Sequence, residues 1–195
     1  MRVIAGSAKG RRLLGPDTRE TRPLTDRARE GVFSALAGLV EGAAVLDLYA
    51  GSGSIGIEAM SRGAGRVVFV EKSREALGAL RQNLANLGFE NVTVVGQDVG
   101  DFLRTATGVF DLIFFDPPWA LDAAVLAEQL KAADRIADDE AELIVHRRRT
   151  DPAPAASGWR LLTTRRYGDG VIYRFEKSPS DPFGEEQDPE DDEQE

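Results

Sequence analysis

A glycine-rich segment with carboxylates on either side is the first part of the sequence whose spacing could serve chemistry. Gly51, Gly53 and Gly56 form a G-x-G-x-x-G pattern directly after the apolar run AAVLDLYA. Glycines let the backbone approach a ligand closely, and a helix that starts here offers free N–H groups to a nucleotide-like cofactor. Glu71 follows 20 residues after Gly51, where its carboxylate can accept hydrogen bonds from both ribose hydroxyls.

Asp47, four positions before Gly51, distinguishes between two such cofactors. NAD and S-adenosylmethionine both contain a ribose, but only the second has an amino-acid ammonium group that this carboxylate can receive. We therefore expect S-adenosylmethionine. Asp98 follows the apolar run VTVV. It can accept a hydrogen bond from the adenine amine, or it can cap the helix that follows.

A second segment, Asp116-Pro117-Pro118-Trp119, follows the apolar run FDLIFF. The two prolines fix their φ angles and remove two N–H donors, so the Asp116 carboxylate and the Pro117 carbonyl project from a stiff loop as acceptors. These acceptors suit an exocyclic amine on a planar base, and Trp119 offers a flat face for stacking. We expect this amine to attack a methyl sulfonium. A rigid turn with an incidental tryptophan is the alternative.

Alternating strands and helices must position these two segments. Five apolar runs predict strands: AAVLDLYA, RVVFV, VTVV, FDLIFF and ELIV. Helices are expected between them, over 54–62, 73–87, 100–105 and 122–134. A further helix is expected after Pro23, capped by Thr25 or Asp26. This regular alternation predicts an α/β fold with a mostly parallel sheet.

The two ends of the chain differ from this centre in pattern and in charge. RVIAGSAKGRRLL predicts a basic N-terminal hairpin, and GWRLLTTRRYGDGVIYRF predicts an antiparallel hairpin at the sheet edge. The whole chain has a net charge of -9, yet residues 1–40 carry +4 and residues 147–177 carry +5. The basic ends therefore predict contacts with nucleic-acid phosphates, although the run Arg147 to Arg149 could also be merely solvated.

The composition excludes several classes of protein. The sequence has no Cys, one His and no apolar run of about 18 residues, so we expect no metal, no membrane span and a cytoplasmic location. We expect a hairpin extension over 1–22, one main domain over 23–177 and a disordered acidic tail over 178–195. The tail either solubilises the protein or competes with nucleic acid for its basic ends. A monomer is the default expectation.

These segments resemble a known family. DLYAGSGSIGIEAMSRGA, FVEKS, QDV and DPPW are similar to class I S-adenosylmethionine-dependent methyltransferases that act on amino groups. RVIAGSAKGRRL, RPLTDRAREGVFSAL and RRYGDGVIYRF resemble the ends of the RsmD-type 16S rRNA guanine-N2 methyltransferases. The resemblance covers nearly all of the chain from Arg2 to Phe175. It implies a Rossmann-like class I methyltransferase fold with a mostly parallel seven-stranded sheet, an antiparallel C-terminal hairpin and a small N-terminal β-hairpin extension.

The resemblance also implies roles for individual residues. Cofactor-binding residues would be Asp47, Ala50, Gly51 and Gly53 at the methionine part, Glu71 at the ribose, Asp98 and Val99 at the adenine, and Thr25 nearby. Asp116 and Pro117 would hold the guanine amine, and Trp119 would stack on the base. Candidate substrate-binding residues are Arg11, Arg12, Arg22, Arg27 and Arg166. The partner implied is 16S rRNA in the small subunit or an assembly intermediate, with guanine 966 as the target.

Two residues depart from the family pattern: Trp119 stands where Tyr or Phe is usual, and His146 stands where an acid is expected. Three alternative functions remain. An N6-adenine DNA or protein glutamine methyltransferase would share the D-P-P-aromatic segment. An NAD-dependent oxidoreductase would share the glycine pattern. A non-catalytic ribosome-assembly factor would share the fold.

Overall fold

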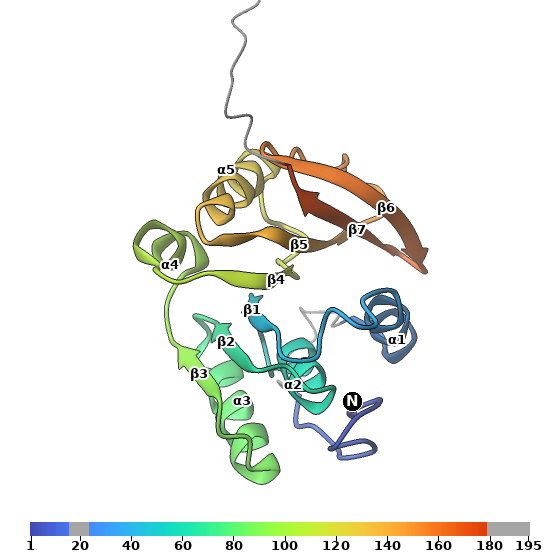
Figure 1. Cartoon of the computed structure of the whole chain (residues 1–195), viewed down its shortest axis with the longest axis vertical. Helices are drawn as coiled ribbons and strands as arrows, with labels where there is room; N and C mark the ends of the chain where they lie inside the picture. Colours follow the sequence, from blue (N-terminus) through green and yellow to red (C-terminus); the bar gives the residue numbers. More distant parts are fainter. Residues whose placement is uncertain (16–23, 179–195) are drawn as a thin grey trace, which may run out of the picture.

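Seven strands form a single sheet in the computed structural model, which describes residues 1–15 and 24–178 (Figure 1). The strand order is β3-β2-β1-β4-β5-β7-β6. The parallel strands are β1 (Ala44–Leu48), β2 (Arg66–Val70), β3 (Val92–Val95), β4 (Phe110–Phe115) and β5 (Ala137–Arg148). The antiparallel strands are β6 (Trp159–Tyr167) and β7 (Gly170–Lys177), which confirm the predicted C-terminal hairpin.

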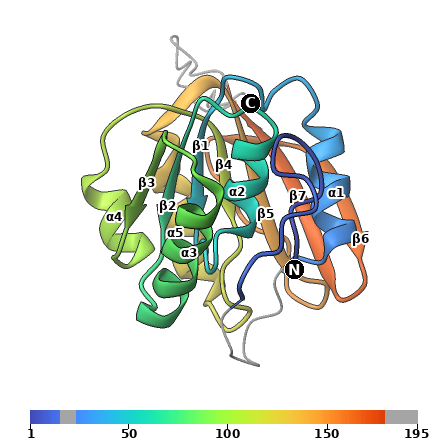
Figure 2. The same ribbon diagram turned by 90° about the horizontal axis from the view of Figure 1, so that it is seen from below.

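Helices cover both faces of this sheet (Figures 1 and 2). One face carries α1 (Asp26–Ala35), α2 (Ser54–Ser61) and α3 (Arg74–Leu87), and the other carries α4 (Val99–Thr105) and α5 (Ala123–Asp134). Successive side chains of a strand point to opposite faces, so neighbours such as Val45 and Leu46 lie in two separate apolar clusters. The predicted α/β fold with a mostly parallel sheet is therefore confirmed.

The helix starts follow local capping rules. Thr25 caps α1, because its Oγ1 accepts a hydrogen bond from the N–H of Ala28 at 3.2 Å. Ser73 caps α3 in the same way, and Gly88 ends that helix with a left-handed φ of 72°. Thr25 rather than Asp26 is thus the cap, and the helices begin and end close to the predicted positions.

The strand order brings the two candidate segments together. β1 lies between β2 and β4, so the chain moves outward from β1 to β3 and then returns to β4 on the other side of β1. Leu48 at the end of β1 pairs with Phe115 at the end of β4. The segments that follow these two strands therefore leave the same edge side by side, at the reversal point where such sheets bind ligands.

The N-terminal segment differs from the predicted hairpin in length. Within residues 1–15, the pairing is limited to an antiparallel bridge between Arg2 and Arg12. The N–H of Val3 donates to the carbonyl of Arg11 at 2.9 Å, and the N–H of Leu13 donates to that of Met1 at 3.1 Å. The ladder stops because the N–H groups of Ile4 and Ala5 donate to the buried carboxylate of Glu58 on α2, at 2.7 and 3.0 Å. The predicted hairpin is therefore present but short, and the loop that it encloses is anchored on α2.

Two further predictions concern residues that the description does not cover. Arg22 lies outside the described residues, as does the predicted tail over 178–195 apart from Ser178.

The strand predicted at ELIV is longer than expected and spans Ala137–Arg148. This extra length carries His146, Arg147 and Arg148 to the edge where the candidate segments lie.

Candidate active site at the carboxyl edge of the sheet

The three glycines after β1 have different structural roles. A Cβ on Gly53 would lie 2.4 Å from Cδ1 of Leu80, and one on Gly56 would lie 2.3 Å from the ring of Phe69. These two glycines therefore allow the loop to pack on α3 and β2. A Cβ on Gly51 would meet nothing within 4 Å, although its φ of 57° is left-handed. Gly51 thus borders open space, where a ligand can approach the backbone.

The turn that leads to these glycines is strained. Tyr49 is the one non-glycine residue with a positive φ, 62°, in the described part of the chain. Its hydroxyl donates to Oε1 of Gln129 at 2.6 Å, and burial raises the pKa of Tyr49. Ala50 is buried, and its N–H donates to the carbonyl of Val70 at 3.0 Å. Backbone strain of this kind is common at ligand-binding turns, where the surrounding packing maintains it.

Asp47 lies beneath the glycine loop and is 1% exposed. Its Oδ2 accepts a hydrogen bond from the N–H of Gly56 at 2.9 Å, while its buried Oδ1 has no partner among the described residues. Burial, together with the charges of Asp116 and Glu71, raises the pKa of Asp47 to about 7. A buried carboxylate oxygen without a donor is suited to an ammonium group, so this site fits the predicted cofactor.

Glu71 and Asp98 both already have partners within the protein. The Glu71 carboxylate accepts from Gly51 N–H at 2.9 Å and from the N–H groups of Lys72 and Ser73 at 2.9 and 2.8 Å. Asp98 caps α4 through Gly100 N–H at 2.8 Å and pairs with Lys72, whose hydrogen bond lowers the Asp98 pKa. The capping role of Asp98 is therefore confirmed, and its contact with adenine stays a prediction.

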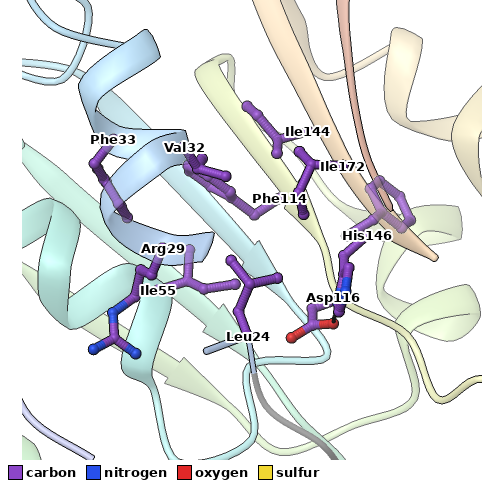
Figure 3. Close-up of a pocket in the computed structure, with 11 residues that line it drawn as sticks. Leu24, Arg29, Val32, Phe33, Ile55, Phe114, Asp116, Ile144, His146 and Ile172 are labelled. Atoms are coloured by element: carbon purple, nitrogen blue, oxygen red, sulfur yellow. Dashed lines mark hydrogen bonds and ion pairs between the residues drawn. The ribbon is translucent and has the colours of Figure 1, made fainter. Parts of the chain in front are cut away.

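Asp116 follows β4 at the same edge of the sheet. Its Oδ1 lies 2.7 Å from Nδ1 of His146, whose ring points at the carboxylate in Figure 3. Its Oδ2 makes no hydrogen bond with the described residues. Pro117 is buried and Trp119 is half-buried, with its ring edge-on to His146 at a centroid distance of 6.4 Å. One Asp116 oxygen is thus oriented and the other remains available.

A cleft of about 400 Å³ lies beside this group. It is bounded by the start of α1, by Trp119 and His146, and by the turn between β6 and β7. Three predicted site residues meet Trp119 there, namely Thr25, Arg27 and Arg166. Both arginines are exposed, so their charges are available to an anionic ligand.

Other predicted residues lie outside this cleft. Arg11 donates to the carbonyl of Asn86 on α3 at 2.7 Å. The backbone of Arg12 forms an antiparallel β-bridge with the backbone of Arg2. Val99 is buried as the first residue of α4, and its side chain packs in the core. The structure thus separates the predicted residues into a glycine-loop group, a cleft group and these remaining positions.

The sequence predicts no role for two residues of this site, His146 and Arg29. His146 departs from the family pattern, and neither its residue type nor its spacing predicts contact with Asp116. Arg29 on α1 is fully buried and lines a narrow apolar pocket that Asp116 and His146 also line (Figure 3). Burial lowers the Arg29 pKa, and Asp26 and Glu58 oppose that effect. Its position in the run DRARE predicts a helix but not burial.

Two general findings apply to residues 1–15 and 24–178. No helix there combines the length and the apolar character that a membrane crossing requires. No group of three or more His, Asp or Glu side chains is arranged to hold a metal ion in the same part of the chain.

Comparison with known proteins identifies the family. The pattern of the family described as conserved hypothetical protein 95 matches residues 1–176. The Ribosomal RNA small subunit methyltransferase D of Haemophilus influenzae is 33% identical over 179 residues, which cover 90% of this chain and 92% of that protein. The chain belongs to this family, the RsmD type.

Other members align over different lengths. The Escherichia coli Ribosomal RNA small subunit methyltransferase D is 40% identical over 119 residues, which span 61% of this chain and 60% of that protein. The solved structure of yhhF from Escherichia coli superposes with a TM-score of 0.82 at 30% identity, over 92% of this chain and 99% of that one. This chain and that solved structure therefore share the same overall fold.

Proposed function

We propose that this chain transfers a methyl group from S-adenosylmethionine to the exocyclic N2 amine of a guanine in 16S rRNA. The observation that carries the proposal is the position of Asp116 and Trp119. They follow β4, with the cleft that Trp119 shares with Arg27 and Arg166 on one side and the glycine loop after β1 on the other. The names of the RsmD-type relatives support an rRNA substrate. The resemblance in sequence adds guanine 966 of an assembling small subunit as the specific target.

The glycine loop would hold the cofactor. The buried Oδ1 of Asp47 would receive the ammonium group, Gly51 would let the methionine part approach the backbone, and Glu71 would accept from the ribose. When bound, S-adenosylmethionine supplies a methyl group on a positively charged sulfur. Asp47 and Glu71 thus provide acceptors for the ammonium group and for the ribose hydroxyls of the ligand.

Asp116 and Pro117 would orient the amine for direct attack. The free Oδ2 of Asp116 accepts one N–H of the amine, and the Pro117 carbonyl accepts the other. The nitrogen lone pair forms the new N–C bond as the C–S bond breaks, and the electrons of that bond stay on sulfur. The methylated amine is positive until it loses a proton to the Asp116 carboxylate, which stabilises that charge before the transfer. Positioning of both reactants contributes about 7 to 11 kcal/mol to such a reaction.

The cleft would select a base that has left its stack. Unstacking a base costs a few kcal/mol, and this cost is smallest in single-stranded RNA loops. Trp119 would stack on the displaced ring, while Arg27 and Arg166 would contact the flanking phosphates. These contacts position the RNA without reading its sequence, so the surrounding RNA structure would define the target.

Nucleoside mass spectrometry tests the proposal. Small subunits and naked 16S rRNA from a strain without its own enzyme are incubated with this protein and labelled S-adenosylmethionine. We expect labelled N2-methylguanosine at one position. Asp116→Ala should lower kcat by about 100-fold or more at nearly unchanged cofactor affinity. Glu128→Gln, an exposed change on α5, is the matched control. Label on adenine, DNA or protein instead would overturn the substrate assignment.

A further inference from the structure

Three consecutive residues at the end of β5 each contact a different residue of the loop after β4. The histidine contacts Asp116, the first arginine contacts Pro118, and the second arginine contacts Trp119. We propose that His146, Arg147 and Arg148 are positioning residues that together hold this loop, residues 116–121, in its reactive geometry. The inference rests on the function proposed above, since the loop carries Asp116 and Trp119.

His146 fixes the orientation of the Asp116 carboxylate. The residue is 8% exposed, and its Nδ1 lies 2.7 Å from Oδ1 of Asp116. The backbone of β7 packs on the other side of the ring, because a Cβ on Gly170 would come within 2.3 Å of Nε2. The imidazole therefore has little freedom to turn. A donor fixed at Oδ1 sets the carboxylate plane and leaves Oδ2 for the amine.

Arg147 holds the loop from the opposite face of the sheet. Side chains alternate along a strand, so Arg147 points away from the side that His146 occupies. Its Nη1 donates to the carbonyl of Pro118 at 3.3 Å, and its Nη2 donates to that of Leu121 at 3.1 Å. Asp151 pairs with the same guanidinium at 2.9 Å, and the residue is only 4% exposed. Its burial with protein partners makes it unsuited to the predicted phosphate contact.

Arg148 covers one face of Trp119. Its Cζ lies 5.0 Å from the centroid of the Trp119 ring, within the range of a cation–π contact. Alternation returns this side chain to the face that carries His146, whose ring meets the indole at an angle of 70°. With one indole face occupied, a base can stack only on the other face. Arg148 therefore fixes both the position of Trp119 and the face of the indole on which a base stacks.

The composition of the loop explains why side chains are needed to hold it. Pro117 and Pro118 have no N–H groups, so the loop cannot be tied to its neighbours by an ordinary backbone ladder. Within the loop, the carbonyl of Pro118 accepts from the N–H of Leu121 at 2.9 Å, and its second lone pair and the carbonyl of Leu121 can accept further donors. A guanidinium offers several donors in a fixed plane and can satisfy two carbonyls at once. Arg147 meets this need, and the neighbouring residues on β5 hold the two functional side chains.

Fluorine NMR tests the proposal without any methyl transfer. The chain has two tryptophans, so incorporation of 5-fluorotryptophan gives two signals, which Trp119→Phe assigns. Trp159 is buried, with its Nε1 bonded to the carbonyl of Leu130 at 3.2 Å, and serves as an internal reference for folding. We expect Arg147→Met and Arg148→Ala to shift or broaden the Trp119 signal and to leave the Trp159 signal unchanged.

Arg149→Ala is the matched control, because this exposed side chain makes no hydrogen bond or ion pair with the described residues. It should leave both signals in place. A Trp119 signal that is unmoved in Arg147→Met and Arg148→Ala would overturn the inference, whatever the activity of the protein. If the proposed methylation fails while the Trp119 signal moves as expected, the loop-positioning role stands and only the reaction assignment falls.

Kinetics test the contribution of His146. We expect His146→Ala to lower kcat by about tenfold or more, with little change in KM for RNA or in cofactor affinity. His146→Asn should restore much of kcat, because its amide nitrogen can donate from nearly the place of Nδ1. Equal loss of kcat in both variants, or a loss that merely follows their thermal stability, would overturn the positioning role.

Discussion

Oδ2 of Asp47 accepts a hydrogen bond from the N–H of Gly56 at 2.9 Å, while Oδ1 of the same carboxylate is buried without a partner in the described part of the chain. The ionised form therefore loses hydration that the protein does not fully replace, and burial raises the Asp47 pKa to about 7. Asp47 thus destabilises the ligand-free protein at neutral pH and at the same time offers an acceptor to a cation. These two effects can be separated by substitution.

Asp47→Asn should stabilise the ligand-free protein at pH 8 and weaken cofactor binding. The pKa of Asp47 is higher in the folded protein than its unfolded value of 3.8. Its contribution to stability is therefore fully present below pH 3.8 and is lost as the pH rises through the folded pKa of about 7. Asn can still accept from Gly56 but cannot pair with an ammonium group. We expect the cofactor Kd to rise by about ten- to a hundredfold. Urea unfolding at pH 5 and pH 8 and calorimetry at pH 8 measure the two effects.

The difference in stability between the wild type and Asp47→Asn is the decisive quantity here. It isolates Asp47 from other groups such as Asp98, whose lowered pKa has the opposite pH dependence. If this difference is the same at pH 5 and pH 8, Asp47 does not titrate as its burial implies.

The glycines of the loop should separate packing from ligand access. Gly56→Ala places a Cβ 2.3 Å from the ring of Phe69 and should cost about 1 to 3 kcal/mol of unfolding free energy. Gly51→Ala meets no protein atom, so only its left-handed φ opposes it, at about 1 to 2 kcal/mol. The Cβ at Gly51 should instead obstruct the cofactor.

The two alanine variants are compared by denaturant unfolding and by cofactor titration. Relative to its effect on stability, Gly51→Ala should show the larger loss of cofactor affinity. Unimpaired cofactor binding in Gly51→Ala would contradict a ligand site over this turn.

Most of the central sheet could be predicted from sequence because its strands are buried and its helices have clear caps. The run RVVFV can form little else than a covered strand, and Ser73 and Gly88 define both ends of α3. The N-terminal segment could not be predicted in the same way. The short length of its hairpin depends on Glu58, which is more than 50 residues away along the chain and takes the N–H groups that a longer hairpin would have used.

The candidate site shows the same limit. Asp116 and Trp119 could be singled out because the two prolines between them have few structural explanations. The contacts that hold the loop could not be predicted, because a run such as His146-Arg147-Arg148 has the same composition whether it is buried or solvated. Only the register of β5 beside β4 shows that these residues reach the loop.

Glu58→Gln should release the N-terminal loop. The buried carboxylate accepts from Ile4 and Ala5 and pairs with Arg62 at 2.7 Å and Arg29 at 3.9 Å. Removal of its charge leaves Arg29 buried without full compensation, which typically costs about 3 to 5 kcal/mol. Hydrogen exchange at the amides of Ile4 and Ala5 should accelerate, and the unfolding free energy should fall. Protection that stays at the wild-type level would show that the loop is held by other contacts.

The salt dependence of RNA binding tests the basic cleft directly. For single-stranded RNA, each phosphate contact contributes about 0.7 to the slope of log K against log salt concentration. Arg27→Gln and Arg166→Gln should therefore each reduce this slope by about 0.7, because both side chains are exposed at the cleft. Arg104→Gln is the matched control, since Arg104 pairs with Asp101 on α4, across the sheet from α1. Equal slopes in all three variants would place the RNA phosphates elsewhere. A reduced slope in Arg27→Gln and Arg166→Gln alone would orient the RNA backbone along the start of α1 and the β6–β7 turn, with its displaced base toward Trp119.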